Sequence, residues 1–125
     1  MAKKRRSPLH VTGPARRDIA AILKRSLEEF GMAASVRYRA LIQQALLDIE
    51  ADHERPGSRE RSEIMAAGVR TYHLSLSRSR GDRSAVKEPR HFVLYRERKD
   101  GVIEVARVLH DSRDLARHLP ENYRG

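Results

Sequence analysis

The sequence predicts an α+β fold in which an N-terminal helical hairpin packs on a small antiparallel β-sheet, in the order β-α-α-β-β-β-α. Apolar residues recur at helical spacing over residues 14–54, and only Gly31 interrupts the pattern. After Gly68 the apolar period becomes that of a strand. The dipeptide Asp100-Gly101 then indicates a tight turn between two strands. Helices that precede an antiparallel sheet in this way are expected to cover one of its faces.

The first half of the chain is expected to form one short strand and two helices. Residues 9–11 fit a short strand, and Thr12-Gly13-Pro14 fits the cap and first turn of a helix that ends at Gly31. A second helix begins near residues 32–35 and fades at residues 53–54. We interpret the apolar stripes of both helices as core, and their members are Ile19, Ile22, Leu23, Leu27, Phe30, Tyr38, Leu41, Ile42, Ala45, Leu46 and Ile49.

The second half is expected to form the sheet. Residues 71–76, 92–95 and 102–110 read as a three-stranded antiparallel meander. The 14 residues 77–90 between the first two strands are long for a hairpin loop and rich in charged side chains, which favours a mobile loop. A short C-terminal helix is expected to begin at Asp111 or Ser112 and to end at Leu119, before a proline.

Length and composition narrow the class of protein. The 125 residues suit one domain over residues 1–125, with residues 1–8 as a flexible basic lead. The absence of cysteine excludes disulfides and cysteine–zinc sites, and is compatible with a reducing cytoplasm. No apolar run approaches the roughly 20 residues that cross a bilayer, and no secretory signal follows the basic lead. We therefore expect a soluble cytoplasmic protein with neither a metal site nor a cofactor.

The chain is strongly basic, with 26 Lys and Arg residues against 17 Asp and Glu residues and a formal charge of +9. Such an excess attracts polyanions and accelerates their association. Nucleic acid and an acidic protein are both suitable partners, and charge alone does not separate them.

Strict alternation divides the last predicted strand into two faces. One face is expected to carry Ile103, Val105, Arg107 and Leu109, and the other Val102, Glu104, Ala106, Val108 and His110. Both faces are partly apolar, so the strand is expected to be covered on both sides. An unpaired charge in such a strand is costly, which singles out Arg107.

Two interpretations of Arg107 remain open. In the first, a carboxylate of Glu104, Asp111 or Asp114 pairs with it, and the pair ties the C-terminal helix to the sheet. In the second, Arg107 and Arg70 form an anion site on the open face of the sheet, because guanidinium groups bind carboxylate or phosphate through two parallel hydrogen bonds.

His110 ends the same strand, at a position where functional groups are often found. Nearby arginines would favour its neutral form, so His110 could act as a general base near neutral pH. Alternatively, it hydrogen-bonds a backbone carbonyl and has no catalytic role. If the protein cleaves a substrate, Arg70, Arg107 and His110 are therefore its candidate catalytic residues.

Short motifs follow one another in a distinctive order along residues 9–119. They are Pro14-Ala15-x-x-Asp18-Ile19-x-x-Ile22, Phe30-Gly31, Pro56-Gly57, Gly68-Val69-Arg70, Tyr95-Arg96 and Arg107-Val108-Leu109-His110, followed by Asp114 and His118-Leu119. In this order they resemble the ParE-type toxins of the RelE/ParE superfamily of bacterial toxin–antitoxin systems. Single motifs are weak, but their order together with the Arg-Val-Leu-His ending carries the resemblance, which implies a RelE/ParE-like fold.

The resemblance also implies a function. ParE-like proteins inhibit growth by binding and poisoning DNA gyrase, and Arg70, Arg107, His110 and Arg113 are the residues expected to bind the target. The implied partner is a ParD-like antitoxin that has a ribbon-helix-helix half and an acidic C-terminal segment, in a heterotetramer or a larger assembly. The residues expected to contact the antitoxin are Ile19, Leu23, Leu27, Tyr38, Leu41 and Tyr95.

Two other classes remain as alternatives. A RelE-like, ribosome-dependent mRNA endoribonuclease would need a base, an acid and cations around the phosphate, and would use Arg70, Arg107 and His110 without a metal. A non-toxic, basic DNA-binding protein would also suit the charge. The long segment 77–90 and the leading Lys3-Lys4-Arg5-Arg6 depart from the family pattern and leave the target open.

Overall fold

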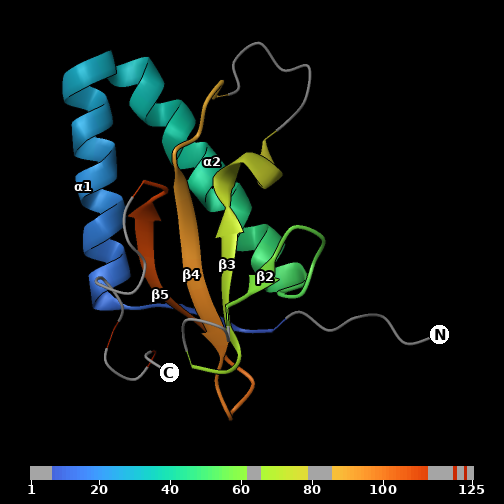
Figure 1. Cartoon of the computed structure of the whole chain (residues 1–125). Coiled ribbons are helices and arrows are strands. Elements are labelled where there is room, and N and C mark those ends of the chain that lie inside the picture. The colour runs from blue at the N-terminus through green and yellow to red at the C-terminus, as the bar shows by residue number, and fades with distance from the viewer. Residues whose placement is uncertain (1–6, 62–65, 79–85, 113–119, 121–122, 124–125) are drawn as a thin grey trace.

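The computed structural model describes residues 7–61, 66–78, 86–112, 120 and 123. Two helices lie against one face of a five-stranded sheet, which confirms the predicted α+β architecture (Figure 1). The elements are β1 (Leu9–Val11), α1 (Gly13–Phe30), α2 (Met32–Ala51), β2 (Arg59–Glu60), β3 (Val69–His73), a 3₁₀ helix (Leu74–Ser77), β4 (His91–Glu97) and β5 (Ile103–His110).

The sheet is larger than the predicted meander, and it is mixed rather than purely antiparallel. Its strand order is β1-β5-β4-β3-β2, in which only β1 runs parallel to its neighbour, with Leu9 opposite Ile103. The antiparallel β3-β4-β5 meander is confirmed. The pairing of β1 with β5 joins segments far apart in the sequence, which local periodicity does not reveal.

Thr12 joins the first helix to the sheet. Its side-chain oxygen accepts a hydrogen bond from the backbone nitrogen of Ala15 (3.2 Å) and donates to the carbonyl of Ala106 (3.1 Å). Its own backbone nitrogen donates to the carbonyl of Val105 (3.1 Å). One residue therefore caps α1 and bonds twice to β5, so that the helix begins where β1 ends.

Gly31 separates the two helices and permits the sharp reversal between them. Its φ of 92° is costly for residues that carry a Cβ atom. Its backbone nitrogen donates to the carbonyl of Leu27 (3.0 Å), which closes α1, and α2 begins at the next residue. The predicted hairpin is confirmed, although α2 ends at Ala51, slightly before the predicted end.

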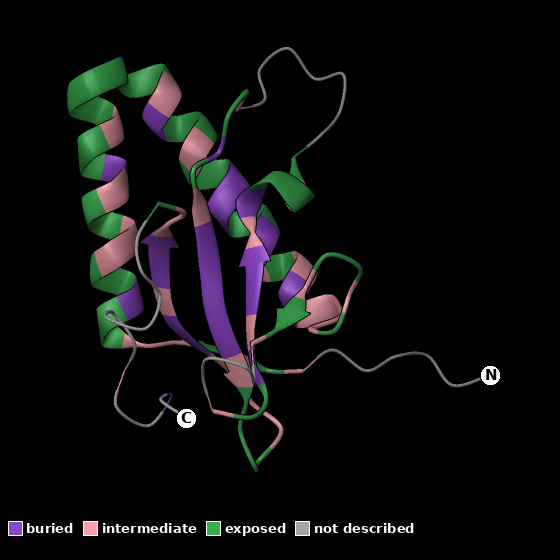
Figure 2. Cartoon of the chain, viewed as in Figure 1, coloured by how far each residue is buried: buried purple, intermediate pink, exposed green. Residues whose placement is uncertain are grey.

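The main core lies between the helices and the sheet, as Figure 2 shows by the buried residues on the strands and on the inner sides of the helices. The largest fully buried side chains in it include Tyr72, Tyr95 and Ile49. Its buried members are Ala15, Leu23, Leu41, Ile42, Ala45, Ile49, Tyr72, Leu74, Val93, Tyr95, Ile103, Val105 and Val108. None of the described helices is long and apolar enough to cross a membrane.

A β-bulge in β5 overturns the predicted division of that strand into two faces. Tyr95 lies opposite Val105, whereas Leu94 lies opposite Arg107, so Ala106 is an extra residue. One extra residue reverses the alternation beyond it. Val108 therefore joins Val105 in the helix-side core, and the prediction that Leu109 shares a face with Val105 is wrong.

The outer face of the sheet carries a second, smaller buried cluster, composed of Val69, Leu94, Ala106 and Tyr123. The Tyr123 hydroxyl donates to a carboxylate oxygen of Glu104 (2.6 Å), and the guanidinium of Arg96 lies 4.4 Å from the centre of its ring. Burial, with Glu104 beside it, raises the pKa of the Tyr123 hydroxyl. Tyr123 thus covers part of the face that the helices leave open.

The strand predicted over residues 71–76 ends early. Its extended part stops at His73, and the next four residues form the 3₁₀ helix, whose nitrogen at Ser75 donates to His73 Nδ1 (3.1 Å). This side-chain cap competes with continued strand pairing. Residues 1–6, residues 113–119 of the predicted C-terminal helix and residues 79–85 of the predicted loop lie outside the described residues.

Candidate functional site

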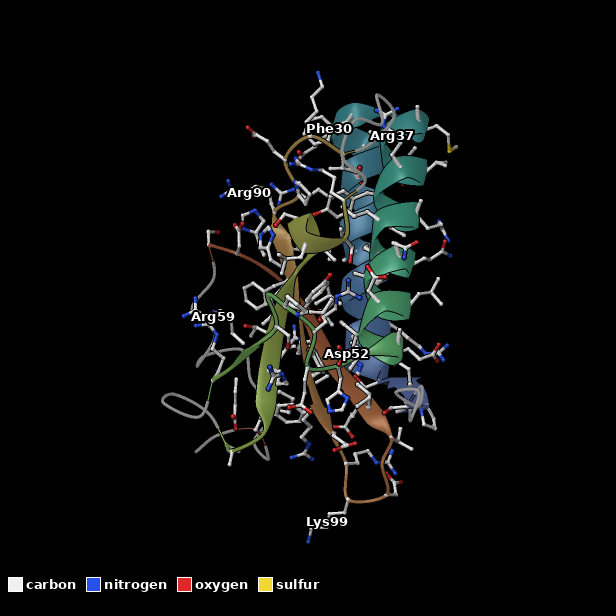
Figure 3. All side chains as sticks on the ribbon, turned by 90° about the vertical axis from the view of Figure 1, so that its right-hand side faces the viewer. Phe30, Arg37, Asp52, Arg59, Arg90 and Lys99 are labelled. Atoms are coloured by element: carbon white, nitrogen blue, oxygen red, sulfur yellow. The ribbon has the colours of Figure 1, made fainter. Side chains whose placement is uncertain are left out.

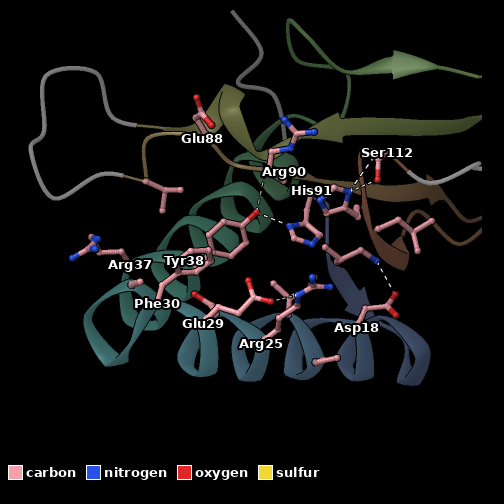
Figure 4. A pocket seen from close by; sticks show the side chains of 18 of the residues that line it. Asp18, Arg25, Glu29, Phe30, Arg37, Tyr38, Glu88, Arg90, His91 and Ser112 are labelled. Carbon is pink, nitrogen blue, oxygen red and sulfur yellow. Dashed lines mark hydrogen bonds and ion pairs between the residues drawn. The ribbon is translucent and has the colours of Figure 1, made fainter.

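A cleft of about 1170 Å³ opens between the helical hairpin and the adjacent ends of β4 and β5 (Figure 4). We call it the basic cleft. Residues of α1 and α2 form one wall, and residues 86–91 and 107–112 form the other. Its charged lining residues are Asp18, Arg25, Glu29, Arg37, Lys87, Glu88, Arg90 and Arg107.

Arg107 is fastened to α1 by a two-pronged ion pair with Asp18. Arg107 Nε donates to Asp18 Oδ2 (2.7 Å), and Nη2 donates to Asp18 Oδ1 (3.0 Å). Asp18 Oδ2 also accepts the backbone N–H of Val108 (3.0 Å), which lies beyond the end of β1 on the β5 edge. The hydrogen bonds to Asp18 raise the pKa of Arg107, against the opposing effect of burial.

This arrangement supports the interpretation that Arg107 has a carboxylate partner, but that partner is Asp18, which the sequence did not indicate. The predicted anion site that combines Arg107 with Arg70 is not formed. Arg70 instead donates to the side-chain oxygen (2.8 Å) and the carbonyl (3.1 Å) of Ser58. The two guanidinium groups therefore belong to separate networks, one on α1 and one beyond the end of α2. Asp114 and Arg113 lie outside the described residues.

Tyr38 and His91 form a hydrogen-bonded pair inside the basic cleft. Tyr38 Oη lies 2.6 Å from His91 Nδ1, and it accepts the backbone N–H of Arg90 (3.1 Å). We assign the shared proton to Tyr38, which makes Nδ1 the acceptor and leaves the ring proton on Nε2. Burial, with His110 nearby, lowers the pKa of His91 to about 4, and burial raises the pKa of Tyr38. Both groups are therefore neutral at pH 7.

His110 lies opposite His91 in the sheet, and their rings meet edge to face with centroids 5.2 Å apart. His110 Nδ1 is bonded to the side chain of Ser112 (2.7 Å) rather than to a backbone carbonyl. It also lies 3.6 Å from a carboxylate oxygen of Asp111. The structure therefore brings His110 and Arg107 to the same cleft, but leaves Arg70 elsewhere.

Asp111, which follows β5, binds residues at the adjacent ends of β3 and β4. It accepts His73 Nε2 (3.1 Å) and pairs with Arg90 Nη2 (3.1 Å). Burial acts to raise the pKa of Asp111, but the hydrogen bond from His73 and the charge of Arg90 outweigh it and lower the pKa. Within the described part of the chain, no group of three or more His, Cys, Asp or Glu side chains could hold a metal ion.

A second hollow, of about 530 Å³, lies between α1 and α2, and most of the residues that line it are apolar. We call it the hairpin groove. Arg16, Lys24 and Arg39 line it together with apolar residues, of which Met32 is 67% exposed. Three residues predicted to contact an antitoxin, Ile19, Leu23 and Leu27, lie in it.

The other three residues predicted to contact an antitoxin are placed differently. Tyr38 lines the basic cleft, and Leu41 is buried in the core. Tyr95 is fully buried, where its hydroxyl donates to the carbonyl of His53 (2.5 Å). In this conformation Tyr95 therefore offers no surface to a partner.

Sequence reasoning missed Asp18, Tyr38 and His91 as members of one site. Asp18 stands in the first motif of the chain, beside the apolar stripe of α1, which is a detectable signal. His91 was harder to find. Counting strand pairs outward from the Asp100-Gly101 turn would place residue 90 opposite His110, and only the bulge brings His91 there.

The fold and these surfaces define a small, basic α+β protein with hollows on two sides of a helical hairpin. A family model described as the ParE toxin of the type II toxin–antitoxin system, parDE, matches residues 9–115. Because this match covers most of the sequence, the chain belongs to the ParE toxin family, which implies a cognate antitoxin as its partner. The comparison with curated proteins found no match.

Proposed function

We propose that this ParE-family toxin inhibits bacterial growth by binding and poisoning DNA gyrase, without catalytic turnover. The placement of the nuclease candidates carries this proposal. Arg107 is bonded to Asp18, and Arg70 is bonded to Ser58 in a different network. An RNA-cleaving site needs its cations around one phosphate, so this separation favours a binding protein over the RelE-like alternative.

The protonation states in the basic cleft support the same proposal. Metal-free cleavage of RNA works best with an acid and a base whose pKa values lie near the operating pH. The pKa of His91 is lowered to about 4, and the pKa of Tyr38 is raised above its usual value. Their hydrogen bond therefore orders the cleft rather than equipping it for proton transfer at neutral pH.

The hairpin groove supports a ParD-like antitoxin with an acidic, partly apolar C-terminal segment. Most of its lining residues are apolar, while Arg16, Lys24 and Arg39 supply positive charge along it. An amphipathic segment with acidic residues matches both properties, since apolar anchors give affinity and charge complementarity accelerates and orients binding. The groove therefore serves as the proposed neutralisation surface.

The proposal is tested by inducing the toxin alone and following both growth and gyrase. We expect growth arrest and accumulation of cleaved DNA bound to gyrase, and purified toxin should inhibit supercoiling by purified gyrase. Primer extension on ribosome-bound transcripts provides the opposing test. Discrete cuts in the mRNA, with supercoiling unaffected, would establish the nuclease alternative instead.

A further inference from the structure

We propose that the basic cleft binds the sugar–phosphate backbone of a single-stranded nucleic acid. This inference rests on the proposed function only for the source of the strand, which would be DNA opened by gyrase. The cleft itself offers what such a ligand needs: cations on both walls, a neutral hydrogen-bond donor between them and an exposed aromatic ring in its lining.

Uncompensated positive charge faces the cleft from both walls. Arg37 of α2 and Lys87 of the segment before β4 are exposed, and among the described residues neither has an ion-pair partner. Arg90 is also exposed and shares Asp111 with His73. Figure 3 shows Arg37 and Arg90 at the same end of the molecule.

The acidic lining residues cancel little of this charge. Asp18 is neutralised by Arg107, and Glu29 is paired with Arg25 (2.8 Å), so among the charged lining residues Glu88 is left to offset Arg37, Lys87 and Arg90. Positive charge on two sides of a groove follows a chain of phosphates better than it encloses a single small anion.

His91 adds a neutral donor to the cleft. Because Tyr38 occupies Nδ1, the Nε2–H remains, and among the described residues it has no hydrogen-bond partner. Phosphate oxygens in nucleic-acid complexes commonly accept from neutral side chains as well as from cations.

Phe30 distinguishes a nucleic acid from an acidic peptide. This side chain lines the cleft and is 72% exposed at the tip of the hairpin, where Figure 4 shows it beside Arg37 and Tyr38. An exposed ring next to cations provides a platform on which an unpaired base can stack. An acidic peptide would use the cations but gain little from the ring, so the observations favour the nucleic acid.

The test measures binding of a fluorescein-labelled twelve-nucleotide oligothymidine to the full chain by fluorescence anisotropy, over a series of salt concentrations. We expect the double variant Arg37→Gln/Lys87→Gln to weaken binding about tenfold and to reduce the salt dependence, by about 0.7 in the logarithmic slope for each phosphate that the protein no longer neutralises. The matched control is Arg59→Gln/Lys99→Gln, which removes the same charge from exposed positions outside the cleft. We expect it to change the affinity less than threefold.

Phe30→Ala tests the aromatic contribution. We expect binding about tenfold weaker with the salt dependence unchanged, because stacking releases no counterions. Leu47→Ala is the control, since Leu47 is 54% exposed on α2 and does not line the cleft. Circular dichroism and unfolding curves confirm that each variant is folded.

Three results would overturn the inference. Equal weakening by both double variants would mean that only the overall charge attracts the strand. A twelve-residue polyglutamate peptide that binds as tightly, with the same dependence on Arg37 and Lys87, would assign the cleft to acidic peptides. Unchanged affinity in Phe30→Ala would show that no base stacks on Phe30.

Two outcomes separate this inference from the proposed function. If the oligonucleotide binds but gyrase is unaffected, only the proposed function fails. If gyrase is poisoned without oligonucleotide binding, this inference fails alone.

Discussion

Asp18 joins the first helix to the last strand across 89 residues of sequence. Its carboxylate satisfies both the guanidinium of Arg107 and a backbone N–H that β1 is too short to reach. Charge-assisted, two-pronged hydrogen bonds of this kind are stronger than neutral ones. One residue therefore neutralises a charge in the sheet and completes the edge of β5.

We predict that Asp18→Ala lowers the free energy of unfolding by about 2 kcal/mol, because it leaves Arg107 and the N–H of Val108 without this acceptor. Glu29→Ala is the matched control, since Glu29 also pairs with an arginine but on the exposed surface of α1. We expect its effect to stay below about 0.5 kcal/mol. Urea unfolding measures both, and equal small losses would remove the special status of the Asp18–Arg107 pair.

His91 gives the protein a specific dependence on pH. Its pKa is about 4 in the folded protein and near the ordinary value of roughly 6.5 in the unfolded chain. Between these values the unfolded chain binds more protons, so His91 contributes stability that is present above about pH 6.5 and is lost as the pH falls toward 4. Asp111 loses its own contribution only below this window, since its pKa is lowered from an already acidic value.

We therefore predict that the wild-type protein loses more stability between pH 6.5 and pH 4 than His91→Asn does. Asparagine can still accept the Tyr38 hydrogen bond but does not titrate. Urea unfolding at several pH values compares the two slopes, and nuclear magnetic resonance of the imidazole should show His91 neutral down to about pH 4. Parallel stability profiles for the two proteins would contradict the assignment.

For single residues, the sequence showed that Arg107 needs a carboxylate partner but not which residue supplies it. An arginine inside an apolar strand requires a carboxylate on physical grounds, and that requirement is met. The identity of Asp18 depends on how α1 crosses β5, which no local pattern encodes. The same holds for Tyr38 and His91, whose hydrogen bond joins α2 to the start of β4.

Among the elements, those with strong periodicity were predicted well. Both helices and the β3-β4-β5 meander follow from apolar spacing and the Asp100-Gly101 turn. The failures come from single residues that change the phase or end an element. The extra residue in β5 moves Val108 into the helix-side core, and the His73 cap ends β3 before its apolar pattern does.

Thr12 allows a test of how α1 is joined to β5, because its side chain caps α1 and donates a hydrogen bond to the carbonyl of Ala106 in the bulge. We predict that Thr12→Val, which keeps the shape but removes the hydroxyl, costs about 1–2 kcal/mol. Thr12→Ser keeps both hydrogen bonds and should cost much less. Thermal unfolding measures both variants, and a serine variant as unstable as the valine variant would show that the methyl group matters more than the hydroxyl.

For the whole molecule, the helical hairpin separates two surfaces of different character. The basic cleft is rich in hydrogen-bonding groups and lies at the end of the sheet, whereas the hairpin groove has a mostly apolar lining on another side of the same helices. Net charge predicted an anionic partner from sequence alone, but it could not divide the charge between two surfaces. That division requires the packing of α1 on α2 and on β5.

The hairpin groove yields a prediction about neutralisation. Leu27→Glu/Met32→Glu places two negative charges in a groove that we propose receives acidic residues, so it should weaken antitoxin binding at least tenfold by repulsion and by the reduced burial of apolar surface. Leu47→Glu is the control, because Leu47 is a similarly exposed leucine outside the groove.

The measurement is co-expression with the cognate antitoxin, followed by co-purification and growth curves. Because the groove lies apart from the basic cleft, the double variant should remain toxic when expressed alone and should no longer be rescued by the antitoxin. Full rescue of the double variant would place the antitoxin elsewhere. Loss of toxicity in the folded variant would instead show that target and antitoxin share the hairpin groove, and that neutralisation works by direct competition for it.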